Sequence, residues 1–258
     1  MHTHYLHAER SCVLSEIQSK GCLDEYLDVL HGTDLVDVFE DGCIEGDDIV
    51  LMFLIDGAQL YVRKASACWI YIWVLFNLPP SMWYKKKFVF IGGFIPGLNN
   101  PKNINSFLLP GLQHLVSLQK EGIWIWDGVL QCELKSKMFL ALLTADGPGM
   151  MHITGLVGYH GKHGCRLYCG LPRHQEPQGE HYFLALLKPI DYNVEDCTHL
   201  DIDIWNLPKP SCKQYNTNLA FLISSPNDSQ YWVWCLATGI SRPSLFSGLI
   251  SSITLGLP

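Results

Sequence analysis

The segment from Ile49 to Tyr61, which reads IVLMFLIDGAQLY, places the strongest constraint on the fold of this chain. Its continuous apolar run, Val50–Ile55, is typical of a β-strand that is buried on both faces. The run leads directly into Asp56, which a rigid sheet would hold at a cleft, although an Asp-Gly pair is also a common turn signal. The same pattern recurs where Phe139–Ala145 leads into Asp146, and this repetition favours a shared role for the two aspartates.

The segments between these two aspartates have clear secondary-structure signals. Aromatic and β-branched residues predict strands at Cys68–Leu78 and Lys87–Ile95, and a glycine pair within the second strand indicates a β-bulge. Apolar residues at helical spacing from Ile104 to Leu118 predict a helix that Gly122 ends. Met138–Ala145 is then the strand that carries the second aspartate.

The resulting order of three strands, a helix and a strand is the core order of an RNase H-like sheet. Three strands that can pair antiparallel are followed by a crossover helix and a parallel strand. In an RNase H-like arrangement the first and last of these strands lie side by side. Asp56 and Asp146 would then converge on one cleft, where they can share a divalent ion. The predicted fold class is therefore α/β: an RNase H-like mixed sheet with flanking helices and a Cys/His-rich insertion.

Composition changes along the chain predict four parts. They are a helical and acidic lead-in at 1–48, an RNase H-like core at 49–150, a Cys/His-rich insertion at 151–210 and an incomplete helical C-terminal segment at 211–258.

Helices are predicted in the first and last of these parts. The lead-in helix begins at Asp24 and ends near His31, and the C-terminal helices cover Gln214–Ser224 and Gln230–Leu236. The acidic residues between Asp34 and Asp48 could form a metal site, but such crowding is more typical of a solvated loop.

Cysteine and histidine pairs in the insertion predict a zinc site. Cys165 and Cys169 form one pair, and Cys197 and His199 form a second. Four further histidines are competing candidates: His160, His163, His174 and His181. Zinc is usually held by four such ligands in a tetrahedral arrangement. The alternative is that the two closely spaced cysteines are small buried apolar residues.

Charge and hydropathy narrow the class of protein. A net charge of −7 argues against a surface built throughout for nucleic acid, but it allows a local basic patch. No secretory signal is visible, and no apolar segment has the length of about 20 residues that a bilayer requires. We therefore expect an intracellular protein without a membrane segment. Lys85, Lys86, Lys87, Lys162 and Arg166 are candidates for phosphate contacts, or else solvated surface residues.

Several motifs, taken together and in order, resemble one family. The motifs include IDGAQLY, TADGPGM, GYHGKHGCRLYCGLP and TGISRPSLFSGL. They are similar to the CACTA (En/Spm) class of transposases, in the form found in fungal transposon relics. The resemblance covers about residues 25–258. It implies an RNase H-like core that cleaves and joins DNA strands with Mg²⁺ or Mn²⁺, with transposon ends as the partner and a nuclear location.

The resemblance also assigns roles to residues. Asp56 matches the first catalytic acid and Asp146 the second, while Cys165 and Cys169 match the cysteine knuckle that follows. Two departures from the family pattern stand out. The chain stops at Pro258, before any third acid can be assigned, and the region from Gln230 to Thr238 lacks the expected basic residues.

These departures predict a C-terminally truncated copy that is inactive as an isolated chain. Two alternatives remain open at this point: a non-catalytic, zinc-stabilised module that binds DNA or protein, and a transposon relic with no selected role.

Overall fold

The computed structural model of the chain contains two compact units. One unit extends to Ala145 and the other begins at Asp146. The structure describes residues 3–59, 67–97, 103–175, 182–183, 187, 201–203, 205–208 and 211–246.

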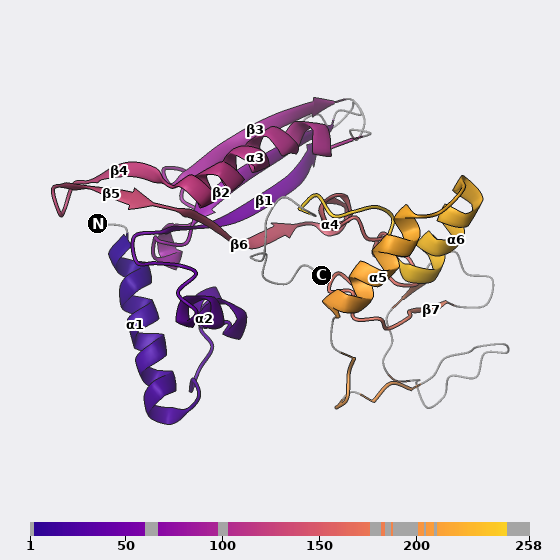
Figure 1. Cartoon of the computed structure of the whole chain (residues 1–258), viewed down its shortest axis with the longest axis horizontal. Coiled ribbons are helices and arrows are strands. Elements are labelled where there is room, and N and C mark those ends of the chain that lie inside the picture. The colour runs from indigo at the N-terminus through magenta and orange to yellow at the C-terminus, as the bar shows by residue number, and fades with distance from the viewer. Residues whose placement is uncertain are drawn as a thin grey trace. The chain divides into compact units, whose positions relative to one another are not determined.

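The first unit is built on a four-stranded mixed sheet with the strand order β3-β2-β1-β6 (Figure 1). Its strands are β1 (Ile49–Gln59), β2 (Ala67–Leu75), β3 (Val89–Gly97) and β6 (Met138–Ala145). Strand β2 pairs antiparallel with both β1 and β3, while β6 pairs parallel with β1. The predicted α/β class is confirmed, because the first three strands pair antiparallel and the last strand returns parallel beside the first.

Strand β1 is buried in the middle of this sheet. Val50 and Ile55 have no exposed surface, and Phe53 is 1% exposed. Because successive side chains of a strand point to opposite faces, this burial means that both faces of the sheet are covered. The continuous apolar run of the sequence therefore corresponds to a two-sided core strand.

The glycine pair of β3 forms the predicted bulge. Tyr71 pairs with Gly93, whereas the next residue, Ile72, pairs with Ile91, so Gly92 is the extra residue of the bulged strand. The Tyr71 ring occupies the space that a Cβ atom at Gly92 would need. Only a residue without a side chain fits this close approach.

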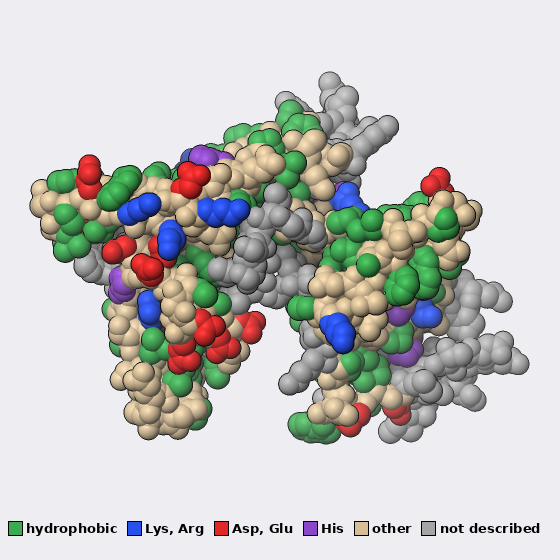
Figure 2. All heavy atoms as spheres, viewed as in Figure 1, with side chains coloured by type: hydrophobic (Ala, Val, Ile, Leu, Met, Phe, Trp, Pro, Cys, Tyr) green, Lys and Arg blue, Asp and Glu red, His purple; other side chains and the backbone are tan. Residues whose placement is uncertain are grey.

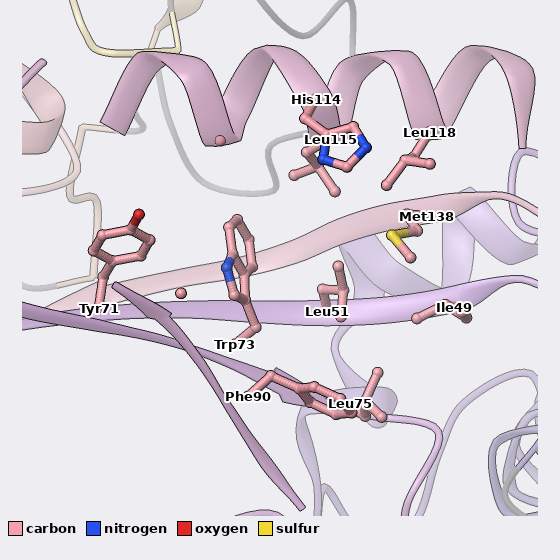
Figure 3. A pocket seen from close by; sticks show the side chains of 12 residues that line it. Ile49, Leu51, Tyr71, Trp73, Leu75, Phe90, His114, Leu115, Leu118 and Met138 are labelled. Carbon is pink, nitrogen blue, oxygen red and sulfur yellow. The ribbon is translucent and has the colours of Figure 1, made fainter. Parts of the chain in front are cut away.

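Helix α3 (Asn105–Glu121) lies over one face of the sheet, and Gly122 ends it at a φ angle of 72° (Figure 1). Leu108, Leu112 and Leu115 are buried on the inner side of the helix. A largely apolar cavity of about 470 Å³ lies between helix and sheet (Figure 3). In this view His114 contributes an imidazole ring to an otherwise mainly apolar lining.

Helical segments pack against the opposite face of the sheet. They are α1 (Thr3–Lys20), the 3-10 helix η1 (Val29–His31) and α2 (Thr33–Glu40). One core cluster joins residues of all three segments, including Leu6, Leu30 and Leu35, with Val50 and Met52 of the sheet. This cluster covers the second face of β1.

The lead-in helix predicted from Asp24 to His31 is wrong. Helix α1 lies earlier in the chain and is followed by Gly21, whose φ angle is 78°. Positive φ is a conformation that glycine adopts readily, so the helix stops there. Helix α2 occupies part of the acidic segment, because Leu35, Val36 and Phe39 bury one side of it.

Two buried polar side chains connect the start of β1 to its neighbours. Asn77 is 3% exposed; its Oδ1 accepts a hydrogen bond from the Val50 N–H at 2.8 Å, and its Nδ2 donates to the Asp48 carbonyl at 2.9 Å. The Asp48 carboxylate accepts from the backbone N–H groups of Glu45 and Lys137, both at 2.8 Å. These bonds satisfy buried groups that would otherwise be costly.

A β-hairpin extends from the region between α3 and β6. Its strands are β4 (Ile123–Asp127) and β5 (Cys132–Ser136), and they form a separate two-stranded sheet (Figure 1). A second 3-10 helix, η2 (Pro80–Met82), follows β2 in the chain.

The second unit contains helices α4 (Gly147–Thr154), α5 (Cys212–Ile223) and α6 (Asp228–Thr238), and the short strands β7 (His174–Gln175) and β8 (Tyr182–Phe183). The two helices predicted near the C-terminus are confirmed as α5 and α6. Tyr168, Tyr215, Leu222 and Ile240 contribute to a buried cluster that holds this unit together.

Across the part of the chain that the structure describes, no helix is both long enough and apolar enough to cross a bilayer.

Candidate active site

Asp56 lies near the end of β1, and it is exposed. It pairs with Ile70 of the neighbouring antiparallel strand, and the preceding residue, Ile55, is fully buried. The change from a buried residue to an exposed carboxylate within one step marks the position where β1 emerges from the core. Strand pairing therefore fixes the backbone of Asp56 while its side chain faces solvent.

Asp146 directly follows β6 and forms the N-cap of helix α4. Its Oδ1 atom accepts a hydrogen bond from the Gly149 N–H at 2.7 Å, and its backbone is extended. An N-cap carboxylate satisfies a helix N–H group and interacts favourably with the positive end of the helix dipole. Asp146 is exposed, so the cap forms at the surface.

A β-bulge in β6 sets the register between the two strands. Ile49 and Leu51 pair with Met138 and Leu140, but Met52 pairs with Leu142, so Ala141 is the extra residue. The shifted register then continues without a further break.

The shifted register continues to the end of β6, while β1 extends further, to Gln59. It pairs Leu54 with Thr144 and Ile55 with Ala145, the residues that immediately precede Asp56 and Asp146.

Carboxylate oxygens are the ligands that Mg²⁺ and Mn²⁺ prefer, and Mg²⁺ commonly takes one or two protein carboxylates. Asp56 and Asp146 have the donor chemistry for such an ion, and both are exposed to solvent. Among the described residues, no group of three or more His, Cys, Asp and Glu side chains is arranged to hold a metal ion.

Cys165 and Cys169 lie within one turn of the second unit. Burial raises the pKa of the Cys165 thiol, but hydrogen bonds from the Cys169 N–H, from the Cys169 side chain and from the Leu167 N–H, together with the Arg173 charge, bring the pKa below its ordinary value. Burial, followed by contributions from Cys165, keeps the pKa of Cys169 above its ordinary value. Backbone N–H groups directed at a sulfur atom stabilise the thiolate, the form that binds metals.

The two cysteines share a pocket of about 390 Å³ with His163. Burial, with a smaller contribution from Lys162, lowers the pKa of His163, which favours its neutral form. The other half of the predicted zinc set, Cys197 and His199, lies outside the described residues.

The predicted phosphate contacts are exposed. Lys85, Lys86 and Lys87 lie between η2 and β3 of the first unit, and Lys162 and Arg166 belong to the second unit. Exposure leaves all five side chains accessible to solvent, as a phosphate contact requires.

The sequence matches a known protein family. The model of the Transposase family tnp2 matches residues 33–176, which is more than half of the chain and includes both aspartates and both cysteines. The chain therefore belongs to the Transposase family tnp2. This membership agrees with the broader resemblance to transposases noted in the sequence. No curated protein matches the chain.

Sequence reasoning did not identify the capping role of Asp146. The signal was present, because Asp146 is followed by Gly147 and by Pro148 in the first helical turn, a common helix-start pattern. The bulge at Ala141 has no such signal, since an alanine within an apolar run does not indicate a register shift.

Proposed function

We propose that this protein is derived from a transposase catalytic core of the RNase H type, in which Asp56 and Asp146 hold a Mg²⁺ or Mn²⁺ ion for DNA strand cleavage and joining. The observation that carries the proposal is the register of β1 and β6. The pairs Leu54–Thr144 and Ile55–Ala145 place side by side the residues that immediately precede Asp56 and Asp146 in the chain. Because each aspartate directly follows one member of the pair Ile55–Ala145, this register favours a shared ion.

Each aspartate has a defined part in the proposed site. Strand pairing to Ile70 holds Asp56, while the cap bond to Gly149 uses Oδ1 of Asp146 and fixes the direction of its carboxylate. The Asp146 carboxylate, which the cap bond already orients, would lose little conformational entropy when an ion binds. A bound ion would stabilise negative charge that develops on a phosphate during strand cleavage.

We further propose that the 258-residue chain binds the ion without cleaving DNA. In the two-metal mechanism of phosphoryl transfer, two ions about 3.5–4 Å apart clamp the attacking and leaving oxygens. Asp56 and Asp146 offer enough carboxylate for one ion, and the second ion would require further ligands. DNA remains the proposed partner, with a nuclear location as the family resemblance implies.

Metal titration of the purified chain tests the aspartate pair. We expect Mn²⁺ to bind the wild-type chain at one site, and both Asp56→Asn and Asp146→Asn to lose that binding. Asp127→Asn is a matched control, because Asp127 is an aspartate at the end of another strand, β4, and has no proposed metal role. Binding that survives in either active-site variant would refute the shared site, and a DNA-nicking assay on the wild-type chain would test the proposed lack of cleavage.

A second proposed function is that of a zinc-stabilised binding module, and the Cys165–Cys169 turn favours it. The N–H groups that lower the pKa of Cys165 would support a zinc thiolate, and Cys197 and His199 would complete the ligand set. We expect about one zinc per chain, lost in Cys165→Ser and retained in the control Cys132→Ser. Wild-type protein purified with zinc in the medium but without bound zinc would exclude this role.

A further inference from the structure

The hairpin of β4 and β5 exposes two tryptophans on one of its faces. Trp124 is 66% exposed and Trp126 is 61% exposed, and they are two residues apart on β4, so they point to the same side. Val129 and Leu130 at the turn are also more than half exposed. Figure 2 shows hydrophobic side chains gathered with charged side chains over this part of the molecule.

Each tryptophan lies beside a charged residue of β5, and these two charged residues have opposite signs. Trp124 pairs with Lys135, and Trp126 pairs with Glu133. All four side chains are exposed and lie on one face of the hairpin, because directly paired residues share a face. We call Trp124, Trp126, Glu133 and Lys135 the ribbon face. It carries one positive and one negative charge, so it is neutral as a whole.

From this arrangement we propose that the ribbon face binds the ribbon face of a second copy of this chain. Consider a two-fold axis that lies between the two faces and runs across the strands. It brings Trp124 of each copy over Trp126 of the other, and Lys135 of each copy over Glu133 of the other. The same patch then complements itself in both its apolar and its charged part, as a two-fold interface requires.

The neutrality of the ribbon face argues for a protein partner over DNA. A surface that binds phosphates needs an excess of Lys and Arg, whereas Glu133 here offsets Lys135. Under the two-fold axis both charges find opposite partners and neither is left unpaired. The ribbon face therefore fits a copy of itself better than it fits a polyanion.

The size of the ribbon face sets the expected affinity. Four tryptophans, each able to bury about 150–250 Å² in full, would contribute less than the roughly 1,200 Å² typical of stable complexes. We therefore expect a weak dimer that forms as the protein concentration rises. This inference does not depend on metal binding at the aspartates.

Sedimentation velocity over a range of protein concentrations measures this dimer. Variants that reverse the charges of Glu133 and Lys135 test whether the ribbon face forms it. Glu133→Lys places lysine against Lys135 of the second copy, and Lys135→Glu places glutamate against Glu133, so each single variant should lower the association constant about tenfold. The double variant exchanges the two charges and restores complementarity, so it should dimerise within about threefold of the wild type. Replacing both tryptophans with serine should abolish the dimer.

Several outcomes would overturn the proposal. They are a wild-type chain that stays monomeric at every concentration, single charge variants that associate as the wild type does, and a double variant no better than the single ones. Binding to single-stranded DNA provides a contrasting readout. If the ribbon face instead stacked nucleobases, Glu133→Lys would raise DNA affinity and Lys135→Glu would lower it, with a monomeric wild type. Circular dichroism confirms that each variant is folded, which we expect because the substituted side chains are exposed.

Discussion

Asp146 has two separable roles, one structural and one chemical, and a pair of substitutions distinguishes them. Its carboxylate caps helix α4 through the bond to the Gly149 N–H, and it is a proposed metal ligand. Asparagine is about as good an N-cap as aspartate, but it has no charge for a metal ion. Alanine removes both properties.

The size of each effect follows from these roles. Asp146→Ala should lower the free energy of unfolding by about 1 kcal/mol, the usual cost of a lost N-cap. For a unit of this size that corresponds to a decrease of about 4–8 °C in the unfolding midpoint. Asp146→Asn should change the midpoint by much less. Magnesium at about 100 times its dissociation constant should stabilise the wild type by about 2.7 kcal/mol and neither variant.

Thermal unfolding followed by circular dichroism, with and without Mg²⁺, measures both effects. Asp228→Asn is a suitable control, because Asp228 lies in the first turn of another helix and has no proposed metal role. If Asp146→Asn destabilises the chain as much as Asp146→Ala does, the loss of the N-cap does not explain the destabilisation. If Asp146→Asn keeps the magnesium-dependent stabilisation, the Asp146 carboxylate is not a metal ligand.

Three further predictions concern stability. Asn77→Ala leaves two buried backbone groups without their partner and should cost about 2–5 kcal/mol in urea unfolding; a loss below about 0.5 kcal/mol would contradict this. Gly155 has a φ angle of 70°, and a side chain there would collide with the Arg242 carbonyl. Gly155→Ala should therefore lower the free energy of unfolding by about 2 kcal/mol or more, and an unchanged urea midpoint would contradict this. Burial, then Arg242, lowers the pKa of His152 below 6.5, so the folded state disfavours its protonation, and stability should fall as pH decreases through 6.5. His152→Asn should weaken this pH dependence, and an identical pH profile would contradict the assignment.

The sheet could be predicted from the sequence because its signals are local. The apolar run of β1, the glycine pair of β3 and the helical spacing of α3 each reflect burial or steric fit at the position itself. The order of the strands in the sheet was predicted from the likeness of this element order to an RNase H-like core. The structure confirms the predicted pairing of β1 with β6.

The lead-in region was harder to predict, because opposing signals overlap there. Residues after Asp24 carry apolar side chains at helical spacing, yet the chain has already turned at Gly21, and only η1 is helical in that segment before Gly32. In α2, Leu35, Val36 and Phe39 lie at helical spacing and are buried on one side of the helix. The many acidic residues around them obscured this pattern in the sequence. Local composition alone does not show which apolar residues find a partner.

The candidate site was predictable as a pair of residues but not as a geometry. Two apolar strands that each end in aspartate were visible in the sequence. The bulge at Ala141 depends on how β6 packs beside β1, and no local pattern specifies it. The cap bond of Asp146 likewise depends on the helix that follows.

Iron-mediated cleavage of the polypeptide tests the central claim most directly. Fe²⁺ can occupy a site built for Mg²⁺, and with ascorbate and peroxide it generates radicals that cut the nearby backbone. A shared ion at Asp56 and Asp146 predicts cuts close to both residues in the wild-type chain, suppressed by excess Mg²⁺ and lost at both positions in either asparagine variant. Cleavage near only one aspartate, or cuts at one position that persist when the other aspartate is replaced, would contradict the claim.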